Sequence, residues 1–129
     1  MSGNKLILDT NAVIFLLKGH QELLDFVKSA DWIAISIISK IEFLAFERLT
    51  EVDKNLFDRF LSRVDIVDLA NGNEGLFENI VKIKQKYNKI KLPDAIIISS
   101  AIVNGCSLVT ADKQLAQVNE LEVINFSIN

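Results

Sequence analysis

Four acidic residues lie at or near the ends of expected strands and helices: Asp9, Glu42, Asp94 and Asp112. Carboxylates gathered in one cleft repel one another and raise each other's pKa values unless cations neutralise them. Hard divalent ions such as Mg²⁺ or Mn²⁺ do this well, because they take oxygen ligands, usually one or two carboxylates with water and phosphate oxygens. These residue types therefore point to a divalent-metal site.

Nitrogen and sulfur ligands are scarce in this chain. It has one histidine, His20, and one cysteine, Cys106. A zinc site usually needs more nitrogen or sulfur ligands than these two residues supply. The same shortage argues against Ser-His-Asp catalysis and against a ribonuclease mechanism that uses two histidines. Cys106 cannot form an internal disulfide, and we expect it to be a small buried side chain.

Each carboxylate also has an ordinary structural alternative. Asp112 could cap a helix, and Asp94 could complement a helix dipole, which is worth about 0.3–1 kcal/mol. Glu42 could be a solvated helix residue, and Asp9 could begin a turn. Asp9 is the hardest to explain in this way, because a carboxylate that closes an apolar strand must find a partner or lose its solvation.

The order of apolar segments predicts an α/β fold. Short apolar runs predict strands at residues 5–9, 32–36, 65–69, 107–110 and 122–126. Helical periodicity and capping residues predict helices at residues 11–18, 21–29, 37–49, 51–64 and 75–87, and a further helix that begins at Pro93 and ends at Gly105. Strands that alternate with helices indicate a mainly parallel sheet with helices on both faces.

This topology would place the acidic residues near one edge of the sheet. Functional sites in parallel sheets lie beyond the carboxyl ends of the strands. Asp9 ends the first strand and Asp112 follows the fourth, so both should project from the same edge. Asp94 begins a helix near that edge, and Glu42 lies inside the helix predicted at residues 37–49.

Length and composition predict a single folded domain over residues 1–129. Half of the residues are apolar and about a quarter are charged, a balance that favours a compact core. No apolar run approaches the roughly 20 residues of a membrane-spanning helix, and the N-terminus does not read as a signal peptide. We therefore expect a cytoplasmic protein with no membrane segment. The net charge of −3 means that a polyanionic substrate would need local basic patches or bound cations.

Four segments resemble the PIN-domain ribonucleases, and most closely the VapC-type toxins of toxin–antitoxin pairs. They are ILDTNAVI at residues 7–14, SIISKIEFL at 36–44, LPDAIIISSAIVNG at 92–105 and LVTADKQL at 108–115. The segments occur in the order typical of the family. The resemblance implies a three-layer α/β/α domain and an endoribonuclease that depends on Mg²⁺ or Mn²⁺. It also implies a cognate antitoxin as partner, and a homodimer.

The resemblance also assigns roles to individual residues. The family's acidic metal-binding positions match Asp9, Glu42, Asp94 and Asp112, and its supporting polar positions match Asn11, Ser39 and Thr110. On this basis the aspartates would hold one or two metal ions, and Glu42 would bind a metal or its water. The supporting residues would orient carboxylates or waters.

Two further features could bind partners. The lysine-rich stretch that contains Lys84, Lys86 and Lys91 is either a solvated helix face or a track for the RNA backbone. In the helix predicted at residues 37–49, Phe43 and Phe46 fall roughly opposite the other apolar residues. They would be buried between two layers of the protein or would form a hydrophobic groove for an antitoxin segment.

Two alternatives remain open at this stage. A phosphatase of the haloacid dehalogenase type also has an aspartate at the end of its first strand, but it usually has a second aspartate two residues later, where this chain has Asn11. A catalytically silent PIN-like binding module is the other alternative. The complete acidic set argues against a silent module, because such a module gains nothing from carboxylates that repel one another.

Overall fold

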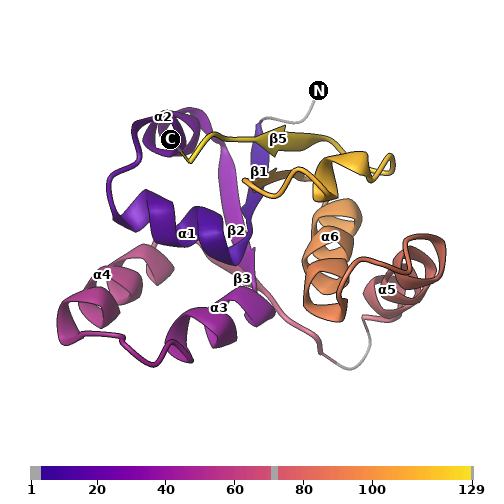
Figure 1. Cartoon of the computed structure of the whole chain (residues 1–129), viewed down its shortest axis with the longest axis horizontal. Coiled ribbons are helices and arrows are strands. Elements are labelled where there is room, and N and C mark those ends of the chain that lie inside the picture. The colour runs from indigo at the N-terminus through magenta and orange to yellow at the C-terminus, as the bar shows by residue number, and fades with distance from the viewer. Residues whose placement is uncertain (1–3, 71–72, 129) are drawn as a thin grey trace.

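The computed structural model describes residues 4–70 and 73–128, and its centre is a five-stranded parallel sheet (Figure 1). The strands are β1 (Lys5–Leu8), β2 (Trp32–Ser36), β3 (Asp65–Val67), β4 (Ser107–Thr110) and β5 (Val123–Asn125), in the order β3-β2-β1-β4-β5. The helices are α1 (Thr10–Leu17), α2 (Gln21–Ser29), α3 (Ile37–Leu44), α4 (Glu51–Leu61), α5 (Glu74–Lys86) and α6 (Leu92–Asn104), with a short 3₁₀ turn η1 (Leu115–Gln117).

Alternating side chains of the central strands bury opposite faces of the sheet in two cores. Leu6 and Leu8 pack with residues of α1 to α4 on one face. Ile7 and Leu108 pack with residues of α5 and α6 on the other face. Figure 1 shows this division, with α1 to α4 on one side of the sheet and α5 and α6 on the other. The predicted three-layer α/β/α fold with a parallel sheet is confirmed.

The strand order places a topological switch point between β1 and β4. From β1 the chain adds β2 and then β3 on one side, and then crosses to add β4 and β5 on the other side. Crevices that bind ligands in parallel sheets form at the carboxyl ends of the strands where the order reverses. Asp9 follows β1 and Asp112 follows β4, so both lie at this crevice.

Local signals explain why the helices start and stop where they do. Asp9 is the N-cap of α1, and its Oδ1 accepts a hydrogen bond from the amide of Ala12 at 2.8 Å. Pro93 occupies the first turn of α6, where its missing N–H costs nothing. Gly105 ends α6 in the left-handed region with φ of 66°, a conformation that favours glycine.

The helix predicted at residues 37–49 is shorter than expected, because α3 ends at Leu44. The chain then turns until Thr50 begins α4 with a capping box, in which Thr50 and Asp53 each bond to the other's backbone. This turn lets the ring of Phe43 stack on Phe57 of α4, with centroids 4.0 Å apart. Tertiary packing therefore ends the helix where no Gly or Pro marks a stop.

Six other predicted elements also end early: β1 at Leu8, α1 at Leu17, α4 at Leu61, β3 at Val67, α5 at Lys86 and β5 at Asn125. Among residues 4–70 and 73–128, no helix combines the length and the apolar character needed to cross a bilayer.

Candidate functional site

Asp9 is a buried carboxylate with two fixed hydrogen bonds. Only 7% of the residue is exposed. One carboxylate oxygen accepts from the amide of Ala12, and the other accepts from the hydroxyl of Thr110. Burial raises the pKa of Asp9 to about 6; these hydrogen bonds oppose the rise, and the charges of Asp94 and Asp112 add to it. The side chain is thus held in one orientation, in surroundings that destabilise its ionised form.

Asp94 and Asp112 bring further negative charge to this edge of the sheet. Asp94 lies in the first turn of α6. Burial raises its pKa, and the charges of Asp112 and Glu42 raise it further, against the opposing effect of Lys91. Asp112 is exposed just beyond β4, and its Oδ1 accepts from the amide of Gln114 at 2.9 Å. Both residues therefore also have local structural roles. Asp94 complements the dipole of α6, and Asp112 stabilises the turn after β4.

Glu42 reaches the site from α3 and bonds to a hydroxyl from α1. The hydroxyl of Thr10 donates to Glu42 Oε1 at 2.5 Å and lies 3.1 Å from the hydroxyl of Ser39. Ser39 is buried, whereas Glu42 is exposed. The contact joins α1 to α3 across the mouth of the crevice and fixes the position of Glu42.

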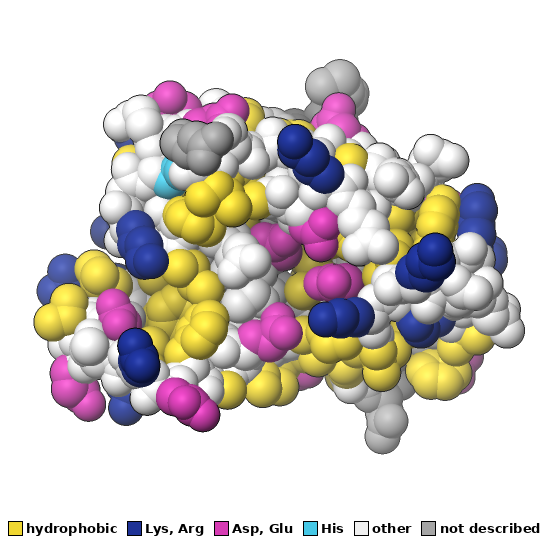
Figure 2. Space-filling view, viewed as in Figure 1, with side chains coloured by type: hydrophobic (Ala, Val, Ile, Leu, Met, Phe, Trp, Pro, Cys, Tyr) yellow, Lys and Arg dark blue, Asp and Glu magenta, His cyan; other side chains and the backbone are white. Residues whose placement is uncertain are grey.

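A pocket of about 400 Å³ opens between these elements. Its lining combines three of the four acidic residues with two polar and three apolar ones: Asp9, Glu42, Asp94, Thr10, Asn11, Ala45, Phe46 and Ile97. Asp112 lies outside the lining but is close enough to raise the pKa values of Asp9 and Asp94. Figure 2 shows acidic side chains gathered in the middle of this face, beside a hydrophobic area over α1, α3 and α4.

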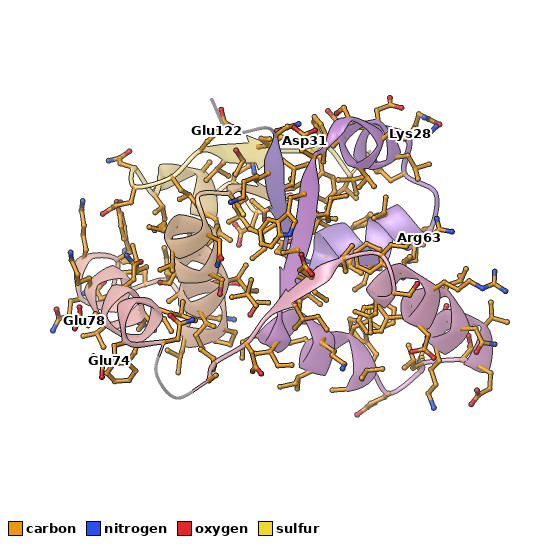
Figure 3. The ribbon with its side chains drawn as sticks, turned by 180° about the vertical axis from the view of Figure 1, so that it is seen from behind. Lys28, Asp31, Arg63, Glu74, Glu78 and Glu122 are labelled. Carbon is orange, nitrogen blue, oxygen red and sulfur yellow. The ribbon has the colours of Figure 1, made fainter. Side chains whose placement is uncertain are left out.

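Several other acidic residues lie away from the crevice. Asp31 and Glu122 precede β2 and β5, so they lie at the amino ends of the strands. The view from behind in Figure 3 shows both at that end of the sheet, and shows Glu74 and Glu78 pointing outward from α5. The concentration of carboxylates at the β1–β4 crevice is therefore a local feature.

Three of the carboxylates line the pocket and Asp112 lies nearby, but they do not form a closed set of ligands. Within the described residues, no three His, Cys, Asp or Glu side chains are close enough together to hold a metal ion. None of the four makes an ion pair with a basic side chain of the described part of the chain. Glu42 instead bonds to Thr10, and Asp112 turns back to the amide of Gln114. The side-chain atoms that could bind a metal here are oxygens, and most of them are anionic, which fits a hard divalent ion.

The lysines predicted to bind RNA differ in their surroundings. Lys84 is partly buried, and its Nζ donates to the backbone carbonyls of Asn88 and Ile90 at 3.2 and 2.7 Å. Lys86 forms an ion pair with Glu120 at 2.9 Å. Lys91 is exposed and acts electrostatically on Asp94. Lys91 is thus the member of the set that is best placed to meet a substrate.

The two phenylalanines also differ. Phe43 is buried in the core against Phe57, whereas Phe46 is 49% exposed. Both line an apolar groove of about 580 Å³ between α1, the end of α3 and α4. Ala45 and Phe46 line this groove and the acidic pocket alike. Phe43 therefore belongs to the floor of the groove, and Phe46 lies at its junction with the acidic pocket.

Two residues at the site were not predicted from the sequence. Thr10 bonds to Glu42, and Asn125 donates through Nδ2 to the carbonyl of Thr110 at 3.0 Å and that of Asp112 at 3.4 Å. Asn125 thereby supports the segment that carries Asp112. An amide side chain in an otherwise apolar last strand was the available signal for Asn125, and the position of Thr10 directly after Asp9 was the signal for Thr10.

Comparison with known proteins identifies related sequences and structures. A family model described as PIN domain matches residues 6–121. The fold is similar to VapBC2 from Rickettsia felis, solved bound to a DNA fragment from its promoter, with a TM-score of 0.78, 25% identity, and coverage of 95% of this chain and 99% of that chain. A toxin–antitoxin complex from Klebsiella pneumoniae matches with a TM-score of 0.72, 26% identity, and coverage of 92% and 99%.

The fold is also shared with VapBC-1 from nontypeable Haemophilus influenzae, at a TM-score of 0.74 and 20% identity, over 94% of this chain and 97% of that chain. No curated protein matches the sequence.

Proposed function

The chain belongs to the PIN domain family, and from that premise we propose that it is a metal-dependent endoribonuclease that acts as the toxin of a toxin–antitoxin pair. The metal would be Mg²⁺ or Mn²⁺, held by Asp9, Asp94 and Asp112, with Glu42 binding the metal or its water. Asn11, Ser39 and Thr110 would support this set. The substrate would be RNA.

One observation carries the proposal: carboxylates from four separate segments converge on a single crevice, and none of them forms an ion pair with a basic side chain in the described part of the chain. Burying Asp9 and placing like charges beside it destabilises its ionised form. A fold that needed only a helix cap at this position could use a neutral Ser or Asn. The arrangement is understandable if a cation neutralises the charge.

A bound divalent ion would supply Lewis-acid chemistry, because it acidifies water and neutralises charge on a phosphodiester. The chain's own residues would prepare the site for this. The hydroxyl of Thr110 and the amide of Ala12 hold Asp9 in one orientation. Thr10 keeps Glu42 against the pocket. Lys91 offsets part of the negative charge beside Asp94, which would ease the approach of a phosphate group.

The similar structures support an antitoxin as partner, since the one from Klebsiella pneumoniae is described as a toxin–antitoxin complex. The apolar groove beside the pocket would receive a hydrophobic segment of that antitoxin, with Phe46 as the exposed contact and Phe43 as part of the floor. A basic side chain on the same segment could then reach the carboxylates. The homodimer remains a prediction, which light scattering would test.

The decisive experiment combines metal binding with RNA cleavage. Calorimetric titration of the purified protein with Mn²⁺ should give binding that is absent after Asp94→Asn. Incubation with a structured RNA transcript and Mg²⁺ or Mn²⁺ should produce internal cuts, and EDTA should stop them. An exposed aspartate on α4 supplies the control, Asp58→Asn, which should change neither result.

The alternatives give different outcomes. A silent binding module would show neither metal-dependent cleavage nor metal binding. Membership of the PIN family argues against the phosphatase alternative. A phosphatase would hydrolyse a generic phosphomonoester such as p-nitrophenyl phosphate, which this protein should leave intact.

A further inference from the structure

We propose that a second, smaller pocket beside the carboxylates binds one nucleobase of the RNA substrate. The proposal rests on the ribonuclease function proposed above. The pocket has a volume of about 160 Å³ and lies between the loop after α5 and the η1 turn. Its lining residues are Tyr87, Asn88, Lys89, Ile90, Gln114 and Gln117.

The side chains of this pocket match the edge and the face of a base. Asn88, Gln114 and Gln117 each carry an amide donor and an amide acceptor side by side, the combination that pairs with base edges. The ring of Tyr87 is half-buried and has Lys86 Nζ 5.4 Å from its centroid, and a base would stack on the part of the ring that lines the pocket. Lys89 adds a positive charge for a neighbouring phosphate, and none of the described lining residues is acidic.

The volume restricts the ligand. Pockets that enclose a whole small-molecule ligand usually measure about 300–1,000 Å³, so about 160 Å³ admits one planar ring but not a complete nucleotide. The groove at Phe46 is larger, at about 580 Å³, and its lining includes Leu17, Leu49 and Leu56. That groove suits apolar side chains, whereas the smaller pocket suits a polar heterocycle.

Contacts within the protein build this pocket before any ligand binds. Lys84 fixes the loop by donating to the carbonyls of Asn88 and Ile90. The hydroxyl of Tyr87 donates to Glu120 Oε1 at 2.6 Å and accepts from the amide of Asn119 at 3.2 Å. These bonds tie the two walls of the pocket together. A site whose walls are already fixed loses less conformational entropy when it binds.

Both walls lead directly to the candidate catalytic residues. The backbone N–H of Gln114 donates a hydrogen bond to Asp112 Oδ1. On the other wall, Ile90 precedes Lys91, whose carbonyl begins α6 by accepting from Ala95, next to Asp94. A base held here would therefore belong to a nucleotide close to the phosphate at the carboxylates, and it would influence where the RNA is cut.

The test compares intact RNA with RNA that lacks one base. The cut site is first mapped in a long transcript, and short RNAs around it are made with an abasic ribose at each position in turn. At one position, loss of the base should lower kcat/KM of the wild-type protein by about tenfold, the scale of the hydrogen bonds that read one base edge. The double variant Gln114→Ala with Gln117→Ala should reduce that ratio to about twofold or less.

An exposed glutamine on α5, outside the pocket, supplies the matched control. Gln85→Ala should keep the wild-type ratio between intact and abasic RNA. If the double variant slows the cleavage of both RNAs equally, or if no abasic position matters, the base subsite is wrong and the nuclease function stands.

Binding without metal separates this proposal from the proposed nuclease activity. Short labelled homopolymers of A, C and U are titrated with each protein in EDTA and followed by fluorescence anisotropy. If wild-type protein cuts no RNA but ranks the homopolymers, and the double variant binds all of them alike, the subsite stands and the nuclease function fails. If the wild-type and double-variant proteins bind with the same ranking, or show no ranking at all, the subsite is wrong.

Discussion

The hydroxyl of Thr110 connects the carboxylate of Asp9 to the backbone of Asp112. It donates to Asp9 and accepts from the backbone amide of Asp112 at 3.0 Å. One buried side chain thus orients the acid that follows β1 and the turn that follows β4. Because Asp9 has little freedom left, its contribution to a metal site would come from position as well as charge.

Neutralising one carboxylate should remove activity but leave the fold intact. We expect Asp9→Asn or Asp94→Asn to abolish RNA cleavage, because the metal would lose an anionic ligand. Thermal stability without metal should be equal or higher, since each change relieves repulsion among like charges. Melting curves and cleavage assays on the same preparations check both statements. Full activity in both variants would remove these residues from the catalytic assignment.

The raised pKa of Asp9 predicts how the stability of the metal-free protein depends on pH. Its usual value is 3.8 and its value in the fold is about 6. Between these values the folded chain binds more protons than the unfolded chain, so the free energy of unfolding falls as the pH rises. Across the whole pH range, deprotonation of Asp9 should lower the free energy of unfolding by about 3 kcal/mol.

Urea unfolding at several pH values between about 4 and 7, in metal-free buffer, measures this loss. Asp9→Asn does not titrate and should flatten the curve. A variant that loses as much stability over this range as the wild-type protein would contradict the assignment of the loss to Asp9.

At the scale of elements, α3 and the turn after it separate a core residue from a surface residue. Phe43→Ala should lower the free energy of unfolding by about 3–5 kcal/mol, because the stack on Phe57 is lost and a cavity remains. Phe46→Ala should change stability little, since the ring is half-exposed. It should instead weaken binding of the cognate antitoxin by about tenfold or more.

Calorimetric titration of each variant with the antitoxin, beside melting curves, separates the two effects. The exposed Val52 of α4 is outside the groove lining, so Val52→Ala serves as the surface control. An antitoxin that binds the Phe46→Ala protein as tightly as wild type would rule out the groove as its docking site.

The same region shows what the sequence could predict about elements. The end of β1 beside Asp9 and the start and end of α6 beside Pro93 and Gly105 were predictable. Each of these residues stabilises the turn in which it lies, without help from distant contacts. The end of α3 at Leu44 was not, because the residues after it carry no Gly or Pro and the turn depends on contact between Phe43 and Phe57.

Side-chain partners were harder to predict than element ends. The expectation of a parallel sheet was enough to assign Asp9, Asp94 and Asp112 to one edge, and the structure places Asp9 and Asp94 in one pocket with Glu42. The ties of Lys84 to the loop after α5 and of Lys86 to Glu120 depend on tertiary contacts. A run of lysines therefore looked like one surface in the sequence but divides into structural and exposed members.

At the scale of the whole molecule, the proposed RNA substrate would require a chain with a net charge of −3 to attract a polyanion. Lys91→Glu should weaken RNA binding and flatten its dependence on salt concentration, since fewer counterions would be released. Lys84→Met should instead lower the melting temperature, because two loop carbonyls lose their donor. Anisotropy titrations over a range of NaCl concentrations, in EDTA, measure the slope.

The control for this experiment is Lys28→Glu. Lys28 lies in the last turn of α2, before β2, and Figure 3 shows it at the end of the sheet away from the carboxylates. It should keep the wild-type slope. Equal slopes for the wild-type, Lys91→Glu and Lys28→Glu proteins would mean that Lys91 is only a solvated residue.

The bond between Thr110 and Asp9 spans 101 positions of the sequence, and this separation governs when the site can exist during synthesis. Strands β1 and β4 are neighbours in the sheet, so Oδ2 of Asp9 has no hydroxyl partner until β4 has left the ribosome, whereas Oδ1 can already accept from the amide of Ala12. At about 5–20 residues per second, that delay lasts several seconds. A ribosome-bound fragment that stops before β4 contains Asp9, Glu42 and Asp94, but it lacks Asp112 and the hydroxyl of Thr110 that orients Asp9. If the chain is the nuclease proposed above, it would gain its full set of carboxylates, and with them activity towards the messenger and the ribosome that produce it, only when almost the whole domain has emerged.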